Sequence, residues 1–517
     1  MSMNHDTLQV VPDLIDAFTE IARRNPQHPA IVHQGRTLNY GRLAELANAL
    51  AGRLGPDPGA VAVPAVHTAE TVVALLGVLT AGGGYCPIDP AFPAARRQAM
   101  AAASNCRTAV VGEALATPEP DCRLVELPAL PKFPGEPPGT APADRTGTGP
   151  EQPAYILFTS GSTGQPKPVA TPRRAVAATA HALRELFGLT PEDRVLQFAS
   201  LNWDTCFEEI LPALTAAATL VLDPDAHCGS FPRFLRMVGR ERITVLDLPT
   251  AFWHELVHHL VDDRARLPSC VRLLVIGGEP VNPARLADWA RLGTDRIRLL
   301  NTYGCTETTQ ITHAVDLAGP LAPGRGGPGT GRAPIGRALP HVVERLGEQD
   351  ELMIGGPGLA LGYLGLPEAT AARFTTIDGE RFFRTGDRVS RDPDGLLTHR
   401  GRLDGELKVR GIRVDPAEVE AHLTGHPDVT AAAVTGATLA GHTTLVAYVV
   451  ARRDASPQDL DGALLSYLRA RVPGHLVPGR ITVVPRLVHT PSGKVDRAGC
   501  HLRYTAHDRS KETSVEH

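Results

Sequence analysis

The segment from Tyr155 to Val169, YILFTSGSTGQPKPV, constrains the fold of this chain more than any other part of it. Its apolar beginning, Tyr155 to Phe158, predicts a buried β-strand that leads directly into a turn rich in glycine and hydroxyl groups. Gly161 and Gly164 permit positive φ, so backbone N–H groups can converge on an anion. Lys167 can add a positive charge there. The hydroxyls of the turn belong to Ser160, Ser162 and Thr163.

This turn matches neither of the two most familiar phosphate-binding sequences. The pattern Gly-x-x-x-x-Gly-Lys-Ser/Thr is absent from it, and so is the dinucleotide pattern Gly-x-Gly-x-x-Gly. A turn of this composition, taken alone, is more often a surface linker, because Ser, Thr and Gly are enriched in loops. The phosphate interpretation therefore depends on motifs elsewhere in the chain.

Length and composition limit the classes of protein that need to be considered. A chain of 517 residues exceeds one hydrophobic core and predicts two or more domains. The net charge of -4 provides no basic surface for nucleic acid or an anionic membrane, so we expect neither partner. The eight cysteines form no Cys-x-x-Cys pair, which argues against a zinc site. No cationic leader and no apolar stretch of membrane-spanning length occurs, so we expect a cytoplasmic protein.

Strand and helix patterns alternate along most of the chain, as in an α/β protein. Residues 40–111 begin this alternation, and a Pro/Gly-rich stretch from Thr117 to Pro153 predicts a long surface loop. Beyond the phosphate turn we expect strands over 194–198, 218–222, 243–248 and 272–276, and helices over 231–240 and 251–261.

A smaller β-rich section follows over 351–401, and the composition changes again at 400–404. We therefore predict an α/β fold with a large N-terminal domain of α/β subdomains plus a β-rich subdomain, followed by a small, mobile α+β C-terminal domain. The predicted boundaries are residues 1–403 for the N-terminal domain, 404–505 for the C-terminal domain and 506–517 for a disordered polar tail.

Six further segments follow a recognisable order. Together with the turn they resemble the motifs of the adenylate-forming superfamily, which includes acyl- and aryl-CoA ligases, luciferases and the adenylation domains of nonribosomal peptide synthetases. Any one segment could arise by chance, but the ordered set spans nearly the whole chain. The segments are Leu79–Pro90, Asn301–Glu307, Glu351–Tyr363, Phe383–Asp387, Gly401–Arg413 and Pro491–Arg497.

The resemblance implies ATP and Mg²⁺ as cofactors and assigns residues to them. Tyr303 would offer its ring to the adenine, and Asp387 would accept hydrogen bonds from the ribose hydroxyls. Glu307 would hold Mg²⁺, a hard cation that prefers oxygen ligands. Lys167 would steady the departing pyrophosphate. The remaining nucleotide-binding positions would be Thr159, Ser160, Gly161, Ser162, Thr163, Gly164, Thr306 and Arg402.

The catalytic lysine implied by the resemblance is Lys494, in the C-terminal domain. Two anions must meet when a carboxylate attacks the α-phosphorus of ATP, and this lysine would bridge them. Asp404 occupies the hinge position, next to Gly401 and Gly405, about which the family's C-terminal domain rotates between two half-reactions. In the second orientation the segment 408–411 would face the tunnel for a phosphopantetheine thiol.

The pair Trp203-Asp204 is similar to the aromatic-Asp pair of amino-acid adenylation domains, whereas acyl-CoA ligases usually have His-Asn in this region. A buried carboxylate at Asp204 would pair with the ammonium group of an amino acid. Transferred position by position, the family's substrate pocket would comprise Asp204, Thr205, Glu208, Asp247, Val275, Gly277, Thr302, Gln310, Ile311 and Lys494.

Two additional carboxyl groups in this pocket, those of Glu208 and Asp247, predict a substrate with a distal cation. Buried carboxylates without a partner are destabilising, and the distal amine of β-lysine, lysine or ornithine would pair with them. Thr205, Val275 and Gly277 would leave room for a methylene chain. Arginine remains an alternative substrate. In the competing interpretation, an arginine of the protein pairs with one of the two carboxylates.

The sequence contains no Gly-Gly-x-Ser phosphopantetheine site, so we expect a separate carrier protein as acceptor, with coenzyme A as the competing acceptor. The sequence does not indicate whether the enzyme requires a small activator protein. Two alternatives to a free-standing amino-acid adenylation enzyme are an acyl- or aryl-CoA ligase and a nucleotide-binding protein with a decayed active site. The presence of Lys167, Glu307, Asp387 and Lys494 together argues against decay.

Overall fold

The structure is a computed structural model that describes residues 11–113, 122–129, 148–159, 166–322, 332–403, 406–409, 412–439, 442–452, 459–489 and 495–512. The chain forms two compact units. The larger contains residues 1–90, 100–158 and 168–403, and the smaller contains 404–517 together with 91–99 and 159–167. The sequence prediction placed its boundary between residues 403 and 404 and did not assign the two short stretches to the C-terminal domain.

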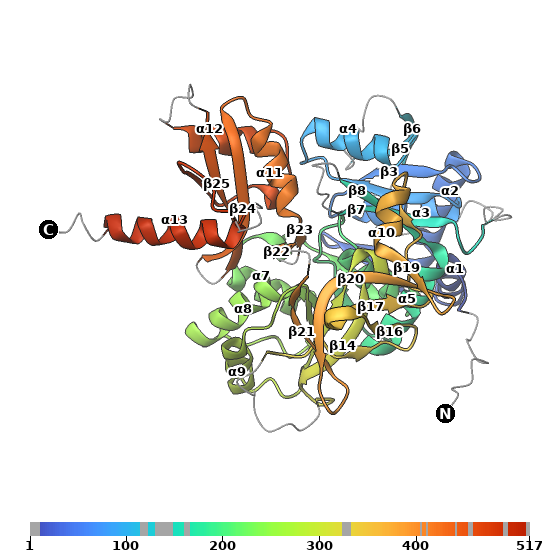
Figure 1. The fold of residues 1–517 in the computed structure, drawn as a ribbon. Helices are drawn as coiled ribbons and strands as arrows, with labels where there is room; N and C mark the ends of the chain where they lie inside the picture. Colours follow the sequence, from blue (N-terminus) through green and yellow to red (C-terminus); the bar gives the residue numbers. More distant parts are fainter. Residues whose placement is uncertain are drawn as a thin grey trace. The chain divides into compact units, whose positions relative to one another are not determined.

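The largest sheet of the larger unit has nine strands, of which β14 is labelled in Figure 1. The order of its strands is β15-β14-β13-β12-β11-β9-β10-β1-β2, and the six strands from β13 to β1 are parallel to one another. The bounds are β1 (Pro29–His33), β2 (Arg36–Asn39), β9 (Arg194–Leu196), β10 (Thr219–Leu222), β11 (Val245–Pro249), β12 (Leu273–Gly277), β13 (Arg298–Gly304), β14 (Ile311–Ala318) and β15 (Arg337–Ala338).

Helices pack on both faces of this sheet because its central parallel strands are apolar along most of their length, and successive side chains point to opposite faces. Leu246, Leu248 and Ile276 belong to the core on the side of α7, α8 and α9, whereas Val245 and Val275 belong to the core on the side of α6. The bounds of these helices are α6 (Thr205–Thr215), α7 (Phe231–Arg240), α8 (Thr250–Asp262) and α9 (Pro283–Arg291), and the short 3-10 helices of the unit are η1 (Pro224–His227), η2 (Thr306–Thr308) and η3 (Glu348–Asp350).

A second sheet in the strand order β18-β8-β7-β4-β3-β5-β6 shares a hydrophobic core with the first sheet and with helices α1, α2, α3, α5 and α6. Its strands are β3 (Ala60–Pro64), β4 (Gly84–Ile88), β5 (Thr108–Val111), β6 (Arg123–Glu126), β7 (Pro153–Thr159), β8 (Lys167–Pro172) and β18 (Gly362–Tyr363). The bounds of the helices are α1 (Leu14–Arg24), α2 (Tyr40–Leu54), α3 (Ala69–Thr80) and α5 (Arg173–Phe187). Helix α4 (Ala94–Ala103) follows β4, and its residues 94–99 belong to the smaller unit.

A five-stranded antiparallel sheet forms the β-rich section of the larger unit, as the sequence predicts. The strand order is β16-β17-β20-β19, with β21 paired to β20. The bounds are β16 (Val343–Leu346), β17 (Glu351–Gly355), β19 (Phe374–Ile377), β20 (Glu380–Arg391), β21 (Leu397–Arg402) and α10 (Pro367–Arg373).

The smaller unit has its own core, formed by a three-stranded sheet, a two-stranded sheet and helices. Helix α13 runs to Glu512, so part of the tail predicted to be disordered from residue 506 is helical; residues 513–517 lie outside the described residues. The bounds are β22 (Leu407–Val409), β23 (Ile412–Val414), α11 (Pro416–Thr424), β24 (Val429–Leu439), β25 (His442–Ala451), α12 (Leu460–Arg469), η4 (Gly474–Leu476), β26 (Arg480–Val483) and α13 (Arg497–Glu512).

The long loop predicted over Thr117–Pro153 contains a short strand that the sequence interpretation missed. Strand β6 pairs in parallel with β5, aligning Ala109 with Leu124. Only one of its four residues, Val125, is buried, so the strand lacks the apolar alternation that would have revealed it. Residues 117–121 and 130–147 of the predicted loop lie outside the described residues.

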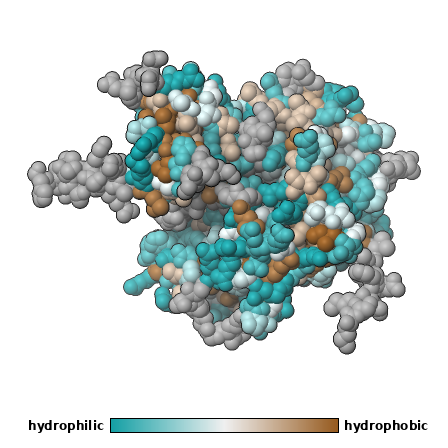
Figure 2. All heavy atoms as spheres, viewed as in Figure 1, coloured by the Kyte–Doolittle hydropathy of each residue, from teal (hydrophilic) through white to brown (hydrophobic). Residues whose placement is uncertain are grey.

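Hydrophilic residues cover most of the coloured surface in Figure 2, and hydrophobic residues appear there as separate spots. Within the described residues no helix combines the length and apolar character needed to cross a membrane.

Candidate active site

The carboxyl ends of three neighbouring parallel strands bring four of the predicted pocket residues together. Asp247 on β11 is aligned with Val275 on β12, and Gly277 at the end of β12 is aligned with Thr302 on β13. Ligands of open α/β sheets bind at this end of the strands. Val275 is fully buried in the core, whereas Asp247 is half-buried.

Gly277 is required by the close approach of β13. A Cβ atom at position 277 would lie 2.5 Å from Oγ1 and 3.2 Å from the carbonyl oxygen of Thr302. Thr302 Oγ1 also donates a hydrogen bond to the carbonyl of Ile276, 2.9 Å away, which fixes the threonine side chain. The glycine therefore makes room for Thr302, a reason that the sequence interpretation did not include.

Helix α6 presents the other acidic residues. Asp204 occupies its N-cap position, Thr205 is its first, exposed residue, and Glu208 lies one turn further along. Glu208 is buried and forms a hydrogen bond with Asp247, so α6 and β11 meet through two carboxyl groups. The sequence interpretation assigned both to one wall of the pocket.

Burial raises the pKa of every carboxyl group in this cluster. The pKa of Asp204 is raised to about 6, with the charge of Glu307 adding to the effect of burial. Burial raises the pKa of Asp247 to about 7, while the hydrogen bond from Glu208 acts in the opposite direction. The pKa of Glu208 is well above its usual value, first through burial and then through Asp247. A nearby cation would lower all three pKa values.

The described residues provide no such cation. Neither Asp204, Glu208 nor Asp247 forms an ion pair with a described arginine or lysine. The Oδ2 atoms of Asp204 and Asp247 are buried without a hydrogen-bond partner in the part of the chain that the structure describes. This arrangement disfavours the interpretation in which an arginine of the protein neutralises the acidic wall.

The turn between β13 and β14 carries two further predicted pocket residues. Thr309 and Gln310 both have positive φ, 58° and 67°, and both are buried. Non-glycine residues seldom adopt this conformation, and buried instances cluster at functional sites. Gly304 accommodates the turn, because a Cβ there would lie 1.7 Å from the carbonyl oxygen of Gln310. Ile311, the next residue, packs in the core.

Thr306 and Glu307 belong to the short helix η2 within the same connection. Glu307 is buried, and its Oε1 accepts a hydrogen bond of 2.7 Å from the hydroxyl of Tyr363. Tyr363 is a residue that the sequence interpretation missed as a site residue. The oxygen donors of Thr306 and Glu307 are of the kind that Mg²⁺ prefers. No cluster of three or more His, Cys, Asp or Glu side chains suited to a metal occurs among the described residues.

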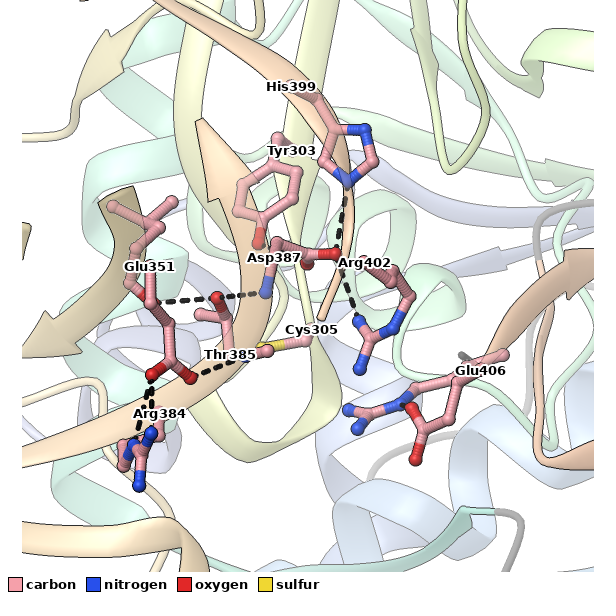
Figure 3. Close-up of polar contacts among 12 residues, drawn as sticks. Tyr303, Cys305, Glu351, Arg384, Thr385, Asp387, His399, Arg402 and Glu406 are labelled. Atoms are coloured by element: carbon pink, nitrogen blue, oxygen red, sulfur yellow. Dashed lines mark hydrogen bonds and ion pairs between the residues drawn. The ribbon is translucent and has the colours of Figure 1, made fainter. Parts of the chain in front are cut away.

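Asp387 is the centre of a second polar cluster (Figure 3). Its Oδ2 accepts a hydrogen bond of 2.7 Å from Tyr303, and its Oδ1 lies 3.0 Å from both Arg402 and His399. Three of these residues were predicted to bind the nucleotide, and the structure brings them into direct contact. His399 was not predicted.

Further hydrogen bonds fix the backbone of the Asp387 motif. Glu351 accepts a hydrogen bond from the backbone N–H of Gly386 and pairs with Arg384, at 3.0 and 2.8 Å (Figure 3). Thr385 Oγ1 accepts the backbone N–H of Asp387 at 3.0 Å. The motif that contains Asp387 is therefore fixed before any ligand binds, as a preorganised site requires.

The remaining predicted site residues lie at or beyond the limits of the described chain. Thr159 ends β7 and Lys167 begins β8, so the two strands flank the predicted phosphate turn. The residues outside the described part are Ser160, Gly161, Ser162, Thr163, Gly164, Asp404 and Lys494.

Comparisons with known proteins bear on this site. The model of a family described as AMP-binding enzyme matches residues 18–364, and that of an AMP-binding enzyme C-terminal domain matches 418–494. Isonitrile lipopeptide synthase of Streptomyces coeruleorubidus is 40% identical over 90% of this chain. Novobiocin biosynthesis protein H of Streptomyces niveus is 34% identical over 94% of it. The chain spans 32% of the first relative and 82% of the second.

Among solved structures, PA1221, an NRPS protein containing adenylation and PCP domains, has a TM-score of 0.77 and 26% identity. The match covers 96% of this chain and 85% of that one.

Proposed function

The chain belongs to the AMP-binding enzyme family, and we propose that it activates an amino acid as its aminoacyl-AMP and transfers it to the phosphopantetheine thiol of a separate carrier protein. The observation that carries the amino-acid assignment is the carboxyl group of Asp204, half-buried, with one oxygen lacking a partner among the described residues. An ammonium group next to the activated carboxylate would supply the missing positive charge.

The specific substrate that we propose has a second, distal amine. The Glu208–Asp247 pair supports this proposal, because the two carboxyl groups contact each other and no described arginine or lysine pairs with either of them. β-Lysine, lysine and ornithine would each place an ammonium group on a methylene chain beside these two carboxyl groups. Arginine would reach it with a guanidinium group.

The adenylation step requires one bond to form and one to break. A carboxylate oxygen of the amino acid bonds to the α-phosphorus of ATP, and the bond from that phosphorus to the bridging oxygen of pyrophosphate breaks. We assign Lys494 to the two approaching anions and Lys167 to the departing pyrophosphate. Asp387 would receive the ribose hydroxyls, within the cluster that includes Tyr303 and Arg402.

Glu307 is the residue that we propose for Mg²⁺, together with the phosphate-binding hydroxyl of Thr306. The metal, when bound, neutralises charge on the phosphate oxygens. Tyr363 holds one oxygen of the Glu307 carboxylate in a fixed orientation, so that its position is set by the protein.

The second step would consume the adenylate. The thiol sulfur of the carrier's phosphopantetheine attacks the carbonyl carbon, the thiol proton is lost, and AMP leaves as the thioester forms. The solved structure of PA1221, which contains adenylation and PCP domains, supports a carrier as the partner class. Coenzyme A is the alternative thiol, and intact-mass measurement with holo-carrier and with coenzyme A separates the two.

ATP–pyrophosphate exchange over a panel of acids tests the activation step. The proposal predicts that a diamino acid gives the highest exchange and that simple carboxylic acids of the same length give almost none. Higher exchange with leucine or phenylalanine than with every diamino acid would contradict the proposed substrate class. Higher exchange with a fatty or aryl acid would favour the CoA-ligase alternative, and ATP binding without exchange on any acid would indicate a decayed site.

A further inference from the structure

Helix α6 carries two consecutive buried glutamates that face different surroundings. Glu208 contacts Asp247 in the acidic wall, as described above. Glu209, which is 1% exposed, instead contacts the segment that connects β9 to α6. This connecting loop, residues 197–204, ends with the Trp203-Asp204 pair, and the sequence interpretation assigned no role to residues 197–200.

The carboxyl group of Glu209 accepts three hydrogen bonds from the beginning of the connecting loop. Its Oε1 accepts the backbone N–H groups of Phe198 and Ala199, at 3.0 and 2.9 Å. Its Oε2 accepts a hydrogen bond of 3.1 Å from the side-chain amide of Gln197. No described arginine or lysine pairs with Glu209, so these N–H donors are what offsets its burial. Burial raises the pKa of this carboxyl group well above its usual value, and the three donors act against that rise.

The hydrogen bonds continue from Gln197 to other parts of the larger unit. The Gln197 amide nitrogen also donates to the carbonyl of Ala199, at 2.6 Å, and the amide oxygen lies 2.7 Å from Nδ1 of His67. The backbone N–H of Gln197 donates to the carbonyl of Val221 on β10, at 2.8 Å. Gln197 therefore cannot turn without breaking several contacts at once.

The second half of the connecting loop is held independently. The Asn202 amide donates to Asp89 at 2.9 Å, and the N–H of Trp203 donates to the carbonyl of Ser200 at 3.1 Å. The two sets of contacts leave little freedom to the backbone between β9 and Asp204. The path of this loop decides where α6 begins and therefore where the Asp204 carboxyl group points.

We propose that Glu209 is a positioning residue that clamps the connecting loop to α6 and thereby sets the position of Asp204 for every amino acid that the enzyme activates. The inference rests on the proposed function for its catalytic consequence. Glu208 and Glu209 would then have separable tasks: the first selects the distal end of the substrate, and the second fixes the anchor for its proximal amine.

A carboxyl group suits this clamp better than an amide does. Glutamine at position 209 keeps an oxygen for Phe198 and Ala199, but its NH₂ group then faces the NH₂ group of Gln197. The Gln197 amide must turn over to restore that hydrogen bond, which breaks its bond to the carbonyl of Ala199. Glu209→Gln should therefore be intermediate between the wild type and Glu209→Ala.

Amide hydrogen exchange and pyrophosphate exchange together test the proposal on the full chain. Glu209→Ala should accelerate amide exchange in peptides covering 197–204 about tenfold or more, with smaller effects elsewhere. It should raise the KM of lysine and of norleucine by similar factors of about tenfold and leave the KM of ATP within about twofold. Glu208→Gln should raise the KM of lysine alone, and the exposed surface variant Glu185→Gln should change neither amide exchange nor KM.

Three results would overturn the inference. The first is fast exchange of the Phe198 and Ala199 amides in the wild-type protein. The second is wild-type amino-acid KM in Glu209→Ala. The third is a uniform rise in amide exchange with a lowered kcat and unchanged KM, which indicates a purely structural residue. Absence of pyrophosphate exchange with any acid in the wild type would instead contradict the proposed function, and local amide exchange would still decide whether Glu209 holds the loop.

Discussion

At the scale of single residues, the substrate assignment depends on the contact between Glu208 and Asp247. Like carboxyl groups in contact retain a proton unless a cation lies beside them, and burial raises the pKa of both groups here. Sequence reasoning placed the two residues on one wall, because their positions matched a family pattern. The sequence alone could not exclude an ion pair between these carboxylates and one of the 47 arginines of the chain. The structure shows that no described arginine forms one.

Replacing Glu208 with glutamine tests the acidic wall directly. Glu208→Gln should lower kcat/KM for the preferred diamino acid by a factor of about 10², because breaking a buried ion pair costs roughly 3 kcal/mol. Exchange with a neutral amino acid of the same length should stay the same or rise. An equal loss for both substrates would show that Glu208 supports the fold and does not select the distal amine.

Two other site residues, His399 and Tyr363, could not be predicted from the sequence. His399 contacts the carboxyl group of Asp387 across β20 and β21, where the pairing register shifts between Arg388 and Val389. Strict alternation along β21 would place residues 399 and 402 on opposite faces, so the irregular register brings His399 into the cluster. Tyr363 reaches Glu307 from a strand 56 residues away in sequence, a contact that no local pattern encodes.

At the scale of elements, the regular alternation of strand and helix patterns made the fold predictable. Strand β10 covers Thr219–Leu222, within one residue of the predicted 218–222, and α7 covers 231–240, as predicted. Parallel strands buried on both faces give continuous apolar runs, which are easy to recognise. Strand β6 was missed because three of its four residues are exposed and its stability depends on its neighbour β5.

Gly277 provides a test of how β12 and β13 pack at the site. Gly277→Ala should shift Thr302, because the new Cβ would lie 2.5 Å from its Oγ1. We expect a loss of about 1–3 kcal/mol in the free energy of unfolding and a higher KM for the amino acid. Gly52→Ala is the matched control, since Gly52 lies on the exposed face of α2 with open space around it. Wild-type Tm and KM in Gly277→Ala would refute the packing argument.

At the scale of the whole molecule, the acidic pocket should make stability depend on pH. The pKa of Asp247 is raised to about 7 in the folded protein and is about 3.9 in an unfolded chain, so folding favours its protonated form. This contribution to stability is fully present below about pH 4 and is lost as the pH rises through 7. The same sign applies to Asp204, whose pKa is raised to about 6.

Asp247→Asn should therefore stabilise the protein at alkaline pH. We expect a gain on the order of 2 kcal/mol in the free energy of unfolding at pH 8 and a much smaller gain at pH 5, measured by denaturant titration without substrate. Asp378→Asn, at a site 78% exposed, should show neither effect. An Asp247→Asn protein that is less stable than the wild type at pH 8 would contradict the raised pKa.

The two compact units also divide the proposed tasks. Every described residue of the predicted pocket belongs to the larger unit, whereas Lys494, outside the described residues, lies in the C-terminal domain predicted from the sequence. Lys494→Ala should lower pyrophosphate exchange by about 10²-fold or more and leave the rise in Tm caused by the preferred amino acid intact. Loss of that rise would show that Lys494, which the predicted pocket also includes, acts mainly in binding the amino acid.

The central claim is that one carboxyl group binds the proximal amine of the substrate and a pair of them binds the distal amine. ATP–pyrophosphate exchange with lysine, norleucine and 6-aminohexanoate at pH 8 tests both parts at once, because each of the last two acids lacks one amine. The account predicts that lysine exceeds norleucine by about 10²-fold in kcat/KM and exceeds 6-aminohexanoate at least as strongly. Norleucine that matches lysine would contradict the acidic wall, and 6-aminohexanoate that matches lysine would contradict the anchor at Asp204.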